Sequence, residues 1–320
     1  MTNLLNYNRL YDCIENWIET PNLSIKSETD IQLSFYRNCM QIYDSHIDQT
    51  VKYTANYSGT VFKKLFGKLV PDICIVDFYN AHAKSSSSGL DLEYLLLHIV
   101  SVLKIKKKNK MVDSDIGQLL HYLRIVLDYS PTSRTYIIGA ITDFEKIRYG
   151  KVSRSNNNYD FIYEASRYLL TSDRNYLLEY LAKIFTIDPS HLGYKKLKPL
   201  PSNIFIHNEL LGIGSNAMVF NCLVDNDKKN EYTLKISNTS VDKEVLIYKT
   251  LYNNKYNIDK VHEYALLFRH PPERIISTVI LFNNLHILWE QIKEAHKNNI
   301  LHCDIRKSNI IEIWNNQTRR

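Results

Sequence analysis

Cysteine is scarce in this chain and is never clustered. No two of its five cysteines form a CxxC or CxxH pair; they are Cys13, Cys39, Cys74, Cys222 and Cys303. Structural zinc sites and disulfide frameworks are built from closely spaced cysteines, so the spacing argues against both. We therefore expect a protein of a reducing compartment.

Long apolar segments are also missing. The longest one, Leu95–Ile105, is interrupted by His98, Ser101 and Lys104, and it is far shorter than the ~20 residues of a membrane-spanning helix. Residues 1–15 lack a basic segment followed by an apolar one, which is the pattern of a secretory signal. We expect a soluble intracellular protein, in the cytoplasm or nucleus, without a membrane partner.

The composition is that of a globular protein. The 320 residues are 44% hydrophobic and 23% charged, with a formal net charge of +6. This length is typical of two domains, and the positive charge is compatible with acidic partners such as nucleotides or nucleic acid. The proline-punctuated segment 195–201 (KKLKPLP) is the expected domain boundary.

Residue patterns predict a mixed α/β (α+β) fold for the first two thirds of the chain. We expect mainly helices over 1–70 and a helix capped by Ser114 or Asp115 with its apolar stripe ending at Leu127. Asn156–Asn158 predicts a surface loop. Strands are expected at 70–78, 92–106, 134–141 and 146–153, and one or two further helices over 161–185.

A glycine-rich segment opens the last third. Residues 210–219 (LLGIGSNAMV) have the form GxGxx(G/A)xV, in which Gly212 and Gly214 allow phosphate oxygens to approach the backbone. Lys235 follows in a strand-like stretch, and Glu244 in a helical stretch that could pair with it. Taken singly, Lys235 could be an exposed strand residue and Glu244 part of a solvated helix face.

The fourth motif of this series is His302–Asn309 (HCDIRKSN), preceded by an amphipathic helix expected over 279–298. The ordered set resembles the protein kinase superfamily. The resemblance implies ATP and Mg²⁺ as cofactors, with Gly212, Gly214, Val219, Lys235 and Glu244 binding the nucleotide. It also implies Asp304 as the catalytic base, Arg306 near the transferring phosphate and Asn309 as a magnesium ligand.

The kinase-like pattern is incomplete. Ala217 replaces the third glycine, and Cys303 replaces the usual arginine of the catalytic loop. The sequence reaches Arg320 before the segment that would carry the second metal-binding aspartate. We therefore expect nucleotide binding without phosphotransfer.

The first part of the chain resembles the PD-(D/E)xK nuclease superfamily. Asp72 after Pro71, then Lys104 on the next strand, then a helix with Gln118 and Tyr122 follow its order. The resemblance implies Asp72 as a magnesium ligand and Lys104 as the residue that activates water. Where the pattern has a second carboxylate, this chain has Val102, which cannot bind Mg²⁺. Lys104 could equally be a solvated strand end, and Asp72 a turn residue.

Lys104–Lys110 (KIKKKNK) is a basic run. It predicts a DNA phosphate-contact patch or a nuclear import signal, unless it is a solvated loop.

The expected domains are a nuclease-like one over 1–155, a helical connector over 156–200 and a kinase-like N-lobe with the start of a C-lobe over 201–320. This order resembles the C-terminal region of Crinkler-type effectors, which implies delivery into another cell and action in its nucleus, although no signal peptide is seen. Two functions remain open: a kinase-like ATP-binding protein, or a non-catalytic module that binds nucleic acid or a protein partner.

Overall fold

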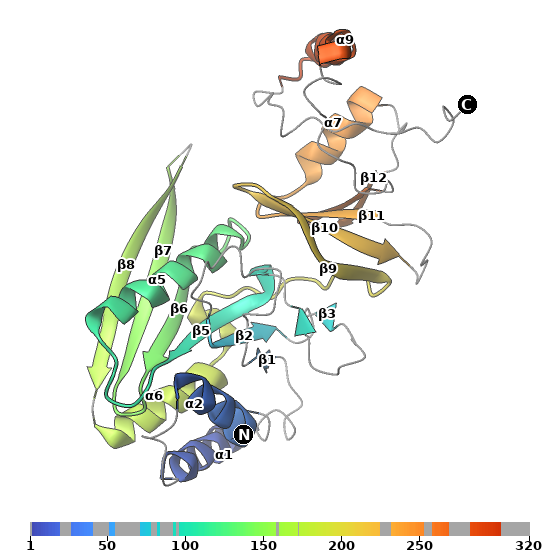
Figure 1. The fold of residues 1–320 in the computed structure, drawn as a ribbon. Coiled ribbons are helices and arrows are strands. Elements are labelled where there is room, and N and C mark those ends of the chain that lie inside the picture. Colours follow the sequence, from blue (N-terminus) through green and yellow to red (C-terminus); the bar gives the residue numbers. More distant parts are fainter. Residues whose placement is uncertain are drawn as a thin grey trace. The chain divides into compact units, whose positions relative to one another are not determined.

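The chain divides into two compact units, Met1–Pro199 (unit 1) and Leu200–Arg320 (unit 2), within the segment expected as the boundary. Figure 1 shows them as a ribbon. The computed structural model describes the following residues: 2–19, 27–40, 51–54, 71–77, 82–83, 92–93, 96–157, 160–171, 173–224, 232–252, 258–268 and 282–301.

Unit 1 is built on a mixed six-stranded sheet with the order β1-β2-β5-β6-β7-β8. Its strands are β1 (Val51–Thr54), β2 (Ile73–Asp77), β5 (Ile99–Ile105), β6 (Tyr136–Thr142), β7 (Ile147–Asn157) and β8 (Asp160–Thr171). Neighbouring strands are antiparallel except for β5 and β6, which are parallel. Helix α5 (Asp113–Asp128) makes the crossover that a parallel pair requires. A short β3 (His82–Ala83) and β4 (Leu92–Glu93) pair separately, and a 3-10 turn, Leu96–His98, precedes β5.

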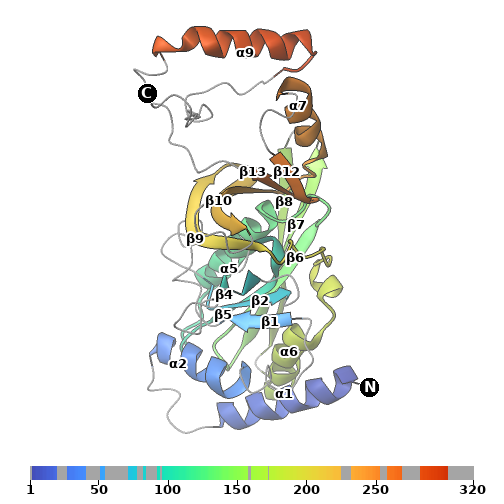
Figure 2. The same cartoon turned by 90° about the vertical axis from the view of Figure 1, so that its right-hand side faces the viewer.

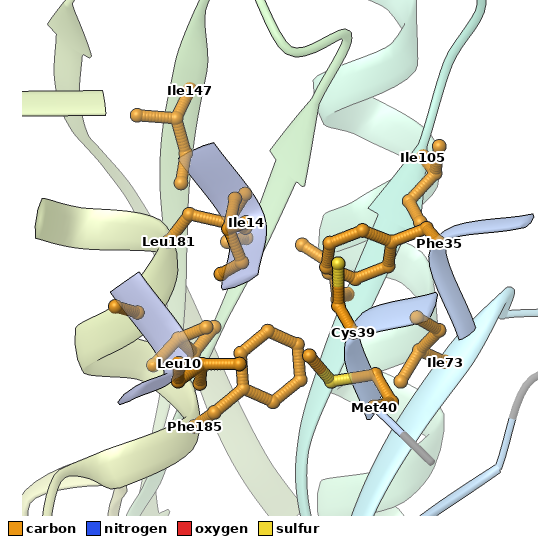
Figure 3. Packing of buried hydrophobic residues seen from close by; sticks show 14 of the residues in the cluster. Leu10, Ile14, Phe35, Cys39, Met40, Ile73, Ile105, Ile147, Leu181 and Phe185 are labelled. Atoms are coloured by element: carbon orange, nitrogen blue, oxygen red, sulfur yellow. The ribbon is translucent and has the colours of Figure 1, made fainter. Parts of the chain in front are cut away.

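Helices cover both faces of this sheet. Successive strand residues point to opposite faces, so Gly139 lies under α5 while its neighbour Ala140 joins the core on the other side. That second core is built with α1 (Thr2–Ile18), α2 (Glu28–Phe35), the π-helical turn η1 (Tyr36–Met40) and α6 (Arg174–Thr186). Figure 2 shows α1 beside α6, and Figure 3 shows Leu10, Phe35 and Phe185 meeting in this core.

Gly139 allows α5 to lie close to the sheet. A methyl group at this position would come 2.7 Å from the Val102 carbonyl oxygen and 2.8 Å from a Leu123 methyl carbon. Such contacts are too short for real side chains, so the glycine sets the spacing between helix and sheet.

Two buried arginines bind the end of α5 to the sheet. The Arg134 guanidinium donates to the carbonyls of Ile99 and Val100, and Arg154 donates to those of Leu127, Ser130, Pro131 and Arg134. Burial lowers the pKa of Arg134 to about 9. Arg154 reaches carbonyls at and beyond the C-terminal end of α5, where unpaired acceptors favour a cation.

Unit 2 is an antiparallel five-stranded sheet with the order β12-β13-β11-β10-β9. Its elements are β9 (Ile204–Ile213), β10 (Ala217–Val224), β11 (Tyr232–Ser237), α7 (Asp242–Tyr252), β12 (Ile258–His262), β13 (Ala265–Phe268) and α9 (Leu285–Lys297). Helix α7 follows β11 directly and packs beside β12 (Figure 1).

The mixed α and β architecture agrees with the predicted class, but several local predictions are wrong. Residues 160–171 form β8 rather than a helix, so the expected helical connector instead supplies a strand of the unit 1 sheet, followed by α6. Asn156 and Asn157, expected in a surface loop, belong to β7, and Asn158 lies outside the described residues. The single strand expected over 92–106 is broken into β4, a 3-10 turn and β5.

Smaller corrections concern helix ends and the first 70 residues. Helix α5 begins at Asp113 after the cap position Val112, and the Asp115 side chain accepts a hydrogen bond from the Val112 N–H. The expected helix over 279–298 is α9, Leu285–Lys297. The mainly helical start contains the strand β1.

Candidate functional sites

The first site is an ion pair in unit 2. Lys235 lies on β11, and its Nζ donates to both carboxylate oxygens of Glu244, at 2.7 and 2.8 Å. Glu244 stands in the first turn of α7, where the helix dipole favours a negative charge. The two side chains are 28% and 27% exposed, so solvent or a ligand can reach the charges. The pairing predicted from the sequence is therefore present.

The glycine-rich segment is held in register with this lysine. On the central strand β10, Val219 lies opposite Gly212 of β9 on one side and opposite Lys235 of β11 on the other. Residues directly opposite one another in a sheet share a face. The three predicted nucleotide-binding positions thus form one row across three strands.

The space over both glycines is open. A methyl group placed on Gly212 would meet nothing within 4 Å, and one on Gly214 would meet only the Ala217 carbonyl oxygen at 3.6 Å. Neither residue has a positive φ. Neither packing nor backbone conformation therefore requires glycine at these two positions.

The turn between β9 and β10 is tied to the strand that carries Lys235. The Gly214 N–H donates to the Ala217 carbonyl at 2.8 Å, which closes the turn. The Asn216 carbonyl accepts from the Asn238 N–H at 2.9 Å and from the Ser237 hydroxyl at 3.3 Å. The turn is thereby fixed at the end of β11.

The predicted catalytic loop, His302–Asn309, lies outside the described residues. It includes Asp304, Arg306 and Asn309, so the first site comprises the five predicted nucleotide-binding residues alone.

The second site is a buried ion pair in unit 1. Ile73 pairs with Leu103, which brings the preceding Asp72 opposite the following Lys104. The Lys104 Nζ donates to Asp72 Oδ1 at 2.9 Å, and the Ile105 N–H donates to Asp72 Oδ2 at 2.6 Å. Each side chain is only 7% exposed. The structure thus joins the two residues predicted for the nuclease-like site.

Sequence reasoning missed a third member of this cluster. Glu28, at the start of α2, has its Oε1 3.6 Å from the Lys104 Nζ. A capping box of Ser27 and Asp30 starts α2 at this residue and so fixes its place. The capping pattern could have located the helix start, but no local pattern links Glu28 to Lys104.

Burial dominates the electrostatics of Asp72. It raises the pKa of this carboxyl to about 6, although Lys104 and the Ile105 N–H both favour the charged form. Burial, followed by the negative charge of Asp72, also raises the pKa of the Tyr122 hydroxyl on α5. The site is a low-dielectric environment in which each added charge is costly.

The described residues of the unit 1 site supply one of the two carboxylates that the nuclease pattern requires. Each oxygen of Asp72 accepts one hydrogen bond, and Val102, buried at the position of the missing carboxylate, offers no ligand atom. Among the residues that the structure describes, no group of three or more His, Cys, Asp or Glu side chains could hold a metal. A lysine takes the charge-neutralising place beside Asp72.

Carboxylates neutralise much of the basic run. Lys104 pairs with Asp72 and Glu28, and Lys106 and Lys108 pair with Asp115 and Glu145. Lys107 and Lys110 make no ion pair with the residues that the structure describes. The charge available for phosphate contacts is thus smaller than the sequence run implies.

Comparison with known proteins gives the chain no family. No protein-family model and no curated protein sequence matches it. In the described parts of the chain, no helix is long and apolar enough to cross a membrane.

Proposed function

We propose that unit 2 binds a nucleoside triphosphate, with ATP and Mg²⁺ as the ligands, in the manner of a protein kinase N-lobe. The observation that carries the proposal is the two-pronged contact of Lys235 with Glu244, in line with the open glycine positions. In kinases a strand lysine pairs with a helix glutamate in this way and contacts the nucleotide phosphates.

The order of elements supports the same proposal. The glycine-rich turn joins the first two strands of the unit, the lysine is on its third strand, and the glutamate is on the helix that follows. A kinase places its glycine-rich loop, strand lysine and helix glutamate in this sequence. The agreement is one of sequence order, strand pairing and side-chain contact together.

The described residues fit the phosphate end of a nucleotide. The open backbone around Gly212 and Gly214 would lie over the phosphates, and Lys235 would contact them while Glu244 holds the lysine in place. Bound Mg²⁺ would neutralise phosphate charge; its proposed ligand, Asn309, is outside the described residues.

Binding of Mg-ATP to the full chain tests this proposal. Calorimetry should give a measurable Kd that rises about tenfold or more in Lys235→Met, since a charge-assisted phosphate contact is lost. The matched control is Lys260→Met, which removes an exposed lysine of the same sheet that pairs with Asp242. An intact chain that binds no nucleotide, or equal binding by both variants, would refute the proposal.

For unit 1 we propose a nuclease-like fold that does not cleave nucleic acid. The buried ion pair of Asp72 with Lys104, together with Val102 at the place of the second carboxylate, favours a non-cleaving fold over a nuclease. An assay with Mg²⁺ or Mn²⁺ and DNA or RNA should show no cutting above the background of Asp72→Ala. Metal-dependent cleavage that disappears in Asp72→Ala would overturn it.

The order of the two proposed units suggests a common setting. A nuclease-like unit followed by a kinase-like unit resembles Crinkler-type effectors, and we place this chain with them as an effector-like protein that acts inside a cell. Its alternative role is that of a non-catalytic module that binds nucleic acid or a protein partner.

A further inference from the structure

Two cysteines from different helical elements of unit 1 meet side by side. Cys13 lies on α1 and Cys39 on the π-helical turn η1, and the two elements pack together. The Cys13 thiol donates to the Asn38 carbonyl at 3.0 Å, and the Cys39 sulfur lies 3.7 Å from the Cys13 carbonyl oxygen. The contact of the Cys39 sulfur with the Cys13 backbone places the two cysteines next to each other.

The pair is asymmetric in exposure. Cys13 is partly exposed, whereas Cys39 is fully buried in the core that Figure 3 shows, beside Phe35 and Met40. An oxidant from solvent therefore reaches Cys13 first. Cys39 stands behind it, where it can attack an oxidised Cys13 without meeting water.

The pKa values of the two thiols also differ: the partly exposed thiol has the lower pKa and the buried thiol the higher one. The hydrogen bond from Cys39 lowers the pKa of Cys13 to about 7, so a large share of Cys13 is thiolate near neutral pH. Burial raises the pKa of Cys39, which keeps it protonated. A reactive, accessible thiolate next to a second cysteine is the arrangement of redox-sensing sites.

We propose that Cys13 and Cys39 are a peroxide-sensitive pair that closes to a reversible disulfide. The Cys13 thiolate attacks the O–O bond of hydrogen peroxide, which yields Cys13 sulfenic acid and hydroxide. The Cys39 sulfur then attacks the sulfenic sulfur; the S–S bond forms, the S–O bond breaks, and the Cys39 proton leaves with the oxygen as water. Peroxide accepts the two electrons, and a dithiol such as dithiothreitol returns them.

This disulfide would act on the unit 1 site. Its loop would contain the whole of α2, whose first residue, Glu28, contacts Lys104. Closing the loop restricts the unfolded chain and fixes α2 against α1. Oxidation would therefore stabilise the helical layer that holds Glu28 in place.

The other described cysteines lack these properties. Cys74 and Cys222 are buried, and burial raises the pKa of both thiols, to about 12 for Cys222. They serve as internal controls for selectivity. Cys303 lies outside the described residues, so the experiment must identify the linked cysteines directly.

Peptide mapping of the full chain tests the proposal. After hydrogen peroxide treatment, alkylation and digestion without reductant, we expect a Cys13–Cys39 linked peptide that dithiothreitol removes. The thermal unfolding temperature of unit 1 should rise on oxidation and return on reduction. Peptides in which Cys13 stays reduced, becomes sulfinic acid or links to another cysteine would overturn the proposal.

Single variants separate the two steps. Cys39→Ser keeps a hydroxyl donor beside Cys13 but cannot form a disulfide, so it should leave Cys13 trapped as sulfenic acid, which dimedone labels; Cys13→Ser should leave Cys39 unmodified. Cys222→Ser is the control and should form the link as the parent does. A Cys39→Ser chain whose Cys13 resists dimedone, or a Cys13→Ser chain whose Cys39 is oxidised as fast as in the parent, would contradict the assigned order. These variants can perturb the core. If they fail to fold, peptide mapping of the parent chain alone tests the proposal.

Discussion

The two units each contain a lysine–carboxylate pair at the centre of a candidate site, and the pairs differ in one respect. The Nζ–O distances are 2.9 Å for Lys104–Asp72 and 2.7 Å for Lys235–Glu244. The first pair is 7% exposed on each side, whereas the second is 28% and 27% exposed. Distance alone does not separate them, but exposure does.

The difference in exposure separates two uses of the same chemistry. A buried pair has lost its hydration, so removal of one partner leaves an uncompensated charge in the interior. A partly exposed pair can exchange partners with a ligand at little cost. The contrast therefore supports the proposal that the unit 2 pair contacts a ligand, and it predicts that unit 1 unfolds more easily when either partner of its buried pair is removed.

The largest expected effect comes from breaking the buried pair. Lys104→Met should destabilise unit 1 by about 3–5 kcal/mol near neutral pH, because Asp72 loses its cation. Urea unfolding of the full chain, followed by a probe in unit 1, measures the loss. Lys108→Met is the matched control: its pair with Glu145 is exposed, and its removal should cost less than about 1 kcal/mol. Equal costs would contradict the distinction between the pairs.

The buried pair should also give unit 1 a pH dependence. The folded-state pKa of Asp72, about 6, lies above its ordinary value of 3.8, so the folded state binds the proton more tightly. The contribution of this group is most favourable below pH 3.8 and declines as the pH rises through 6. Relative to Asp72→Asn, the parent should lose about 1–3 kcal/mol over this interval. A constant difference between the two proteins across this range would show that Asp72 has an ordinary pKa.

The exposed pair should separate stability from binding. Glu244→Gln should change the free energy of unfolding of unit 2 by less than about 1 kcal/mol, because both groups stay solvated. The same variant should weaken nucleotide binding, since Lys235 loses the carboxylate that orients it. Chemical unfolding and calorimetry on the same samples give both numbers. A stability loss as large as that of Lys104→Met would show that the exposed pair and the buried pair contribute alike to folding.

The smallest expected effect on stability is at Gly212. Alanine there meets open space at an ordinary φ, so stability should stay constant or rise by about 0.5–1 kcal/mol. Nucleotide affinity should fall because the methyl group would occupy the space in which the proposed phosphate binds. Gly139→Ala is the counterpart in unit 1, where the methyl group would collide with Val102 and Leu123. Unaltered nucleotide affinity in Gly212→Ala would show that the open space has no ligand role.

The pattern of apolar residues predicted those helices and strands whose limits depend only on nearby residues in the sequence. The run after Pro71 gave β2, and the apolar stripe ending at Leu127 gave α5. The stretch 160–171 was mistaken for helix because its apolar residues run on into those of α6. Asp173 separates the two elements. Its side chain caps α6 by accepting hydrogen bonds from the Asn175 and Tyr176 N–H groups. Reading Asp173 as a cap would have ended the preceding element there.

The contacts of the candidate sites likewise fall into those that the sequence could predict and those that it could not. Lys235 and Glu244 are close in sequence and follow a spacing pattern, so their pairing could be predicted. Glu28 reaches Lys104 only because α2 packs near the end of β5, and no local pattern encodes that contact. The loss of free charge in the basic run likewise depends on Glu145 and Asp115, which tertiary folding brings to the lysines.

The buried arginines of unit 1 have a consequence for the order in which the chain folds. Arg154, on β7, has its guanidinium acceptors on Leu127, Ser130, Pro131 and Arg134, at the end of α5 and the turn that follows it. If β7 docked before this turn existed, a guanidinium would enter the interior without acceptors, at a cost of several kcal/mol. Formation of the α5 terminus should therefore precede docking of β7.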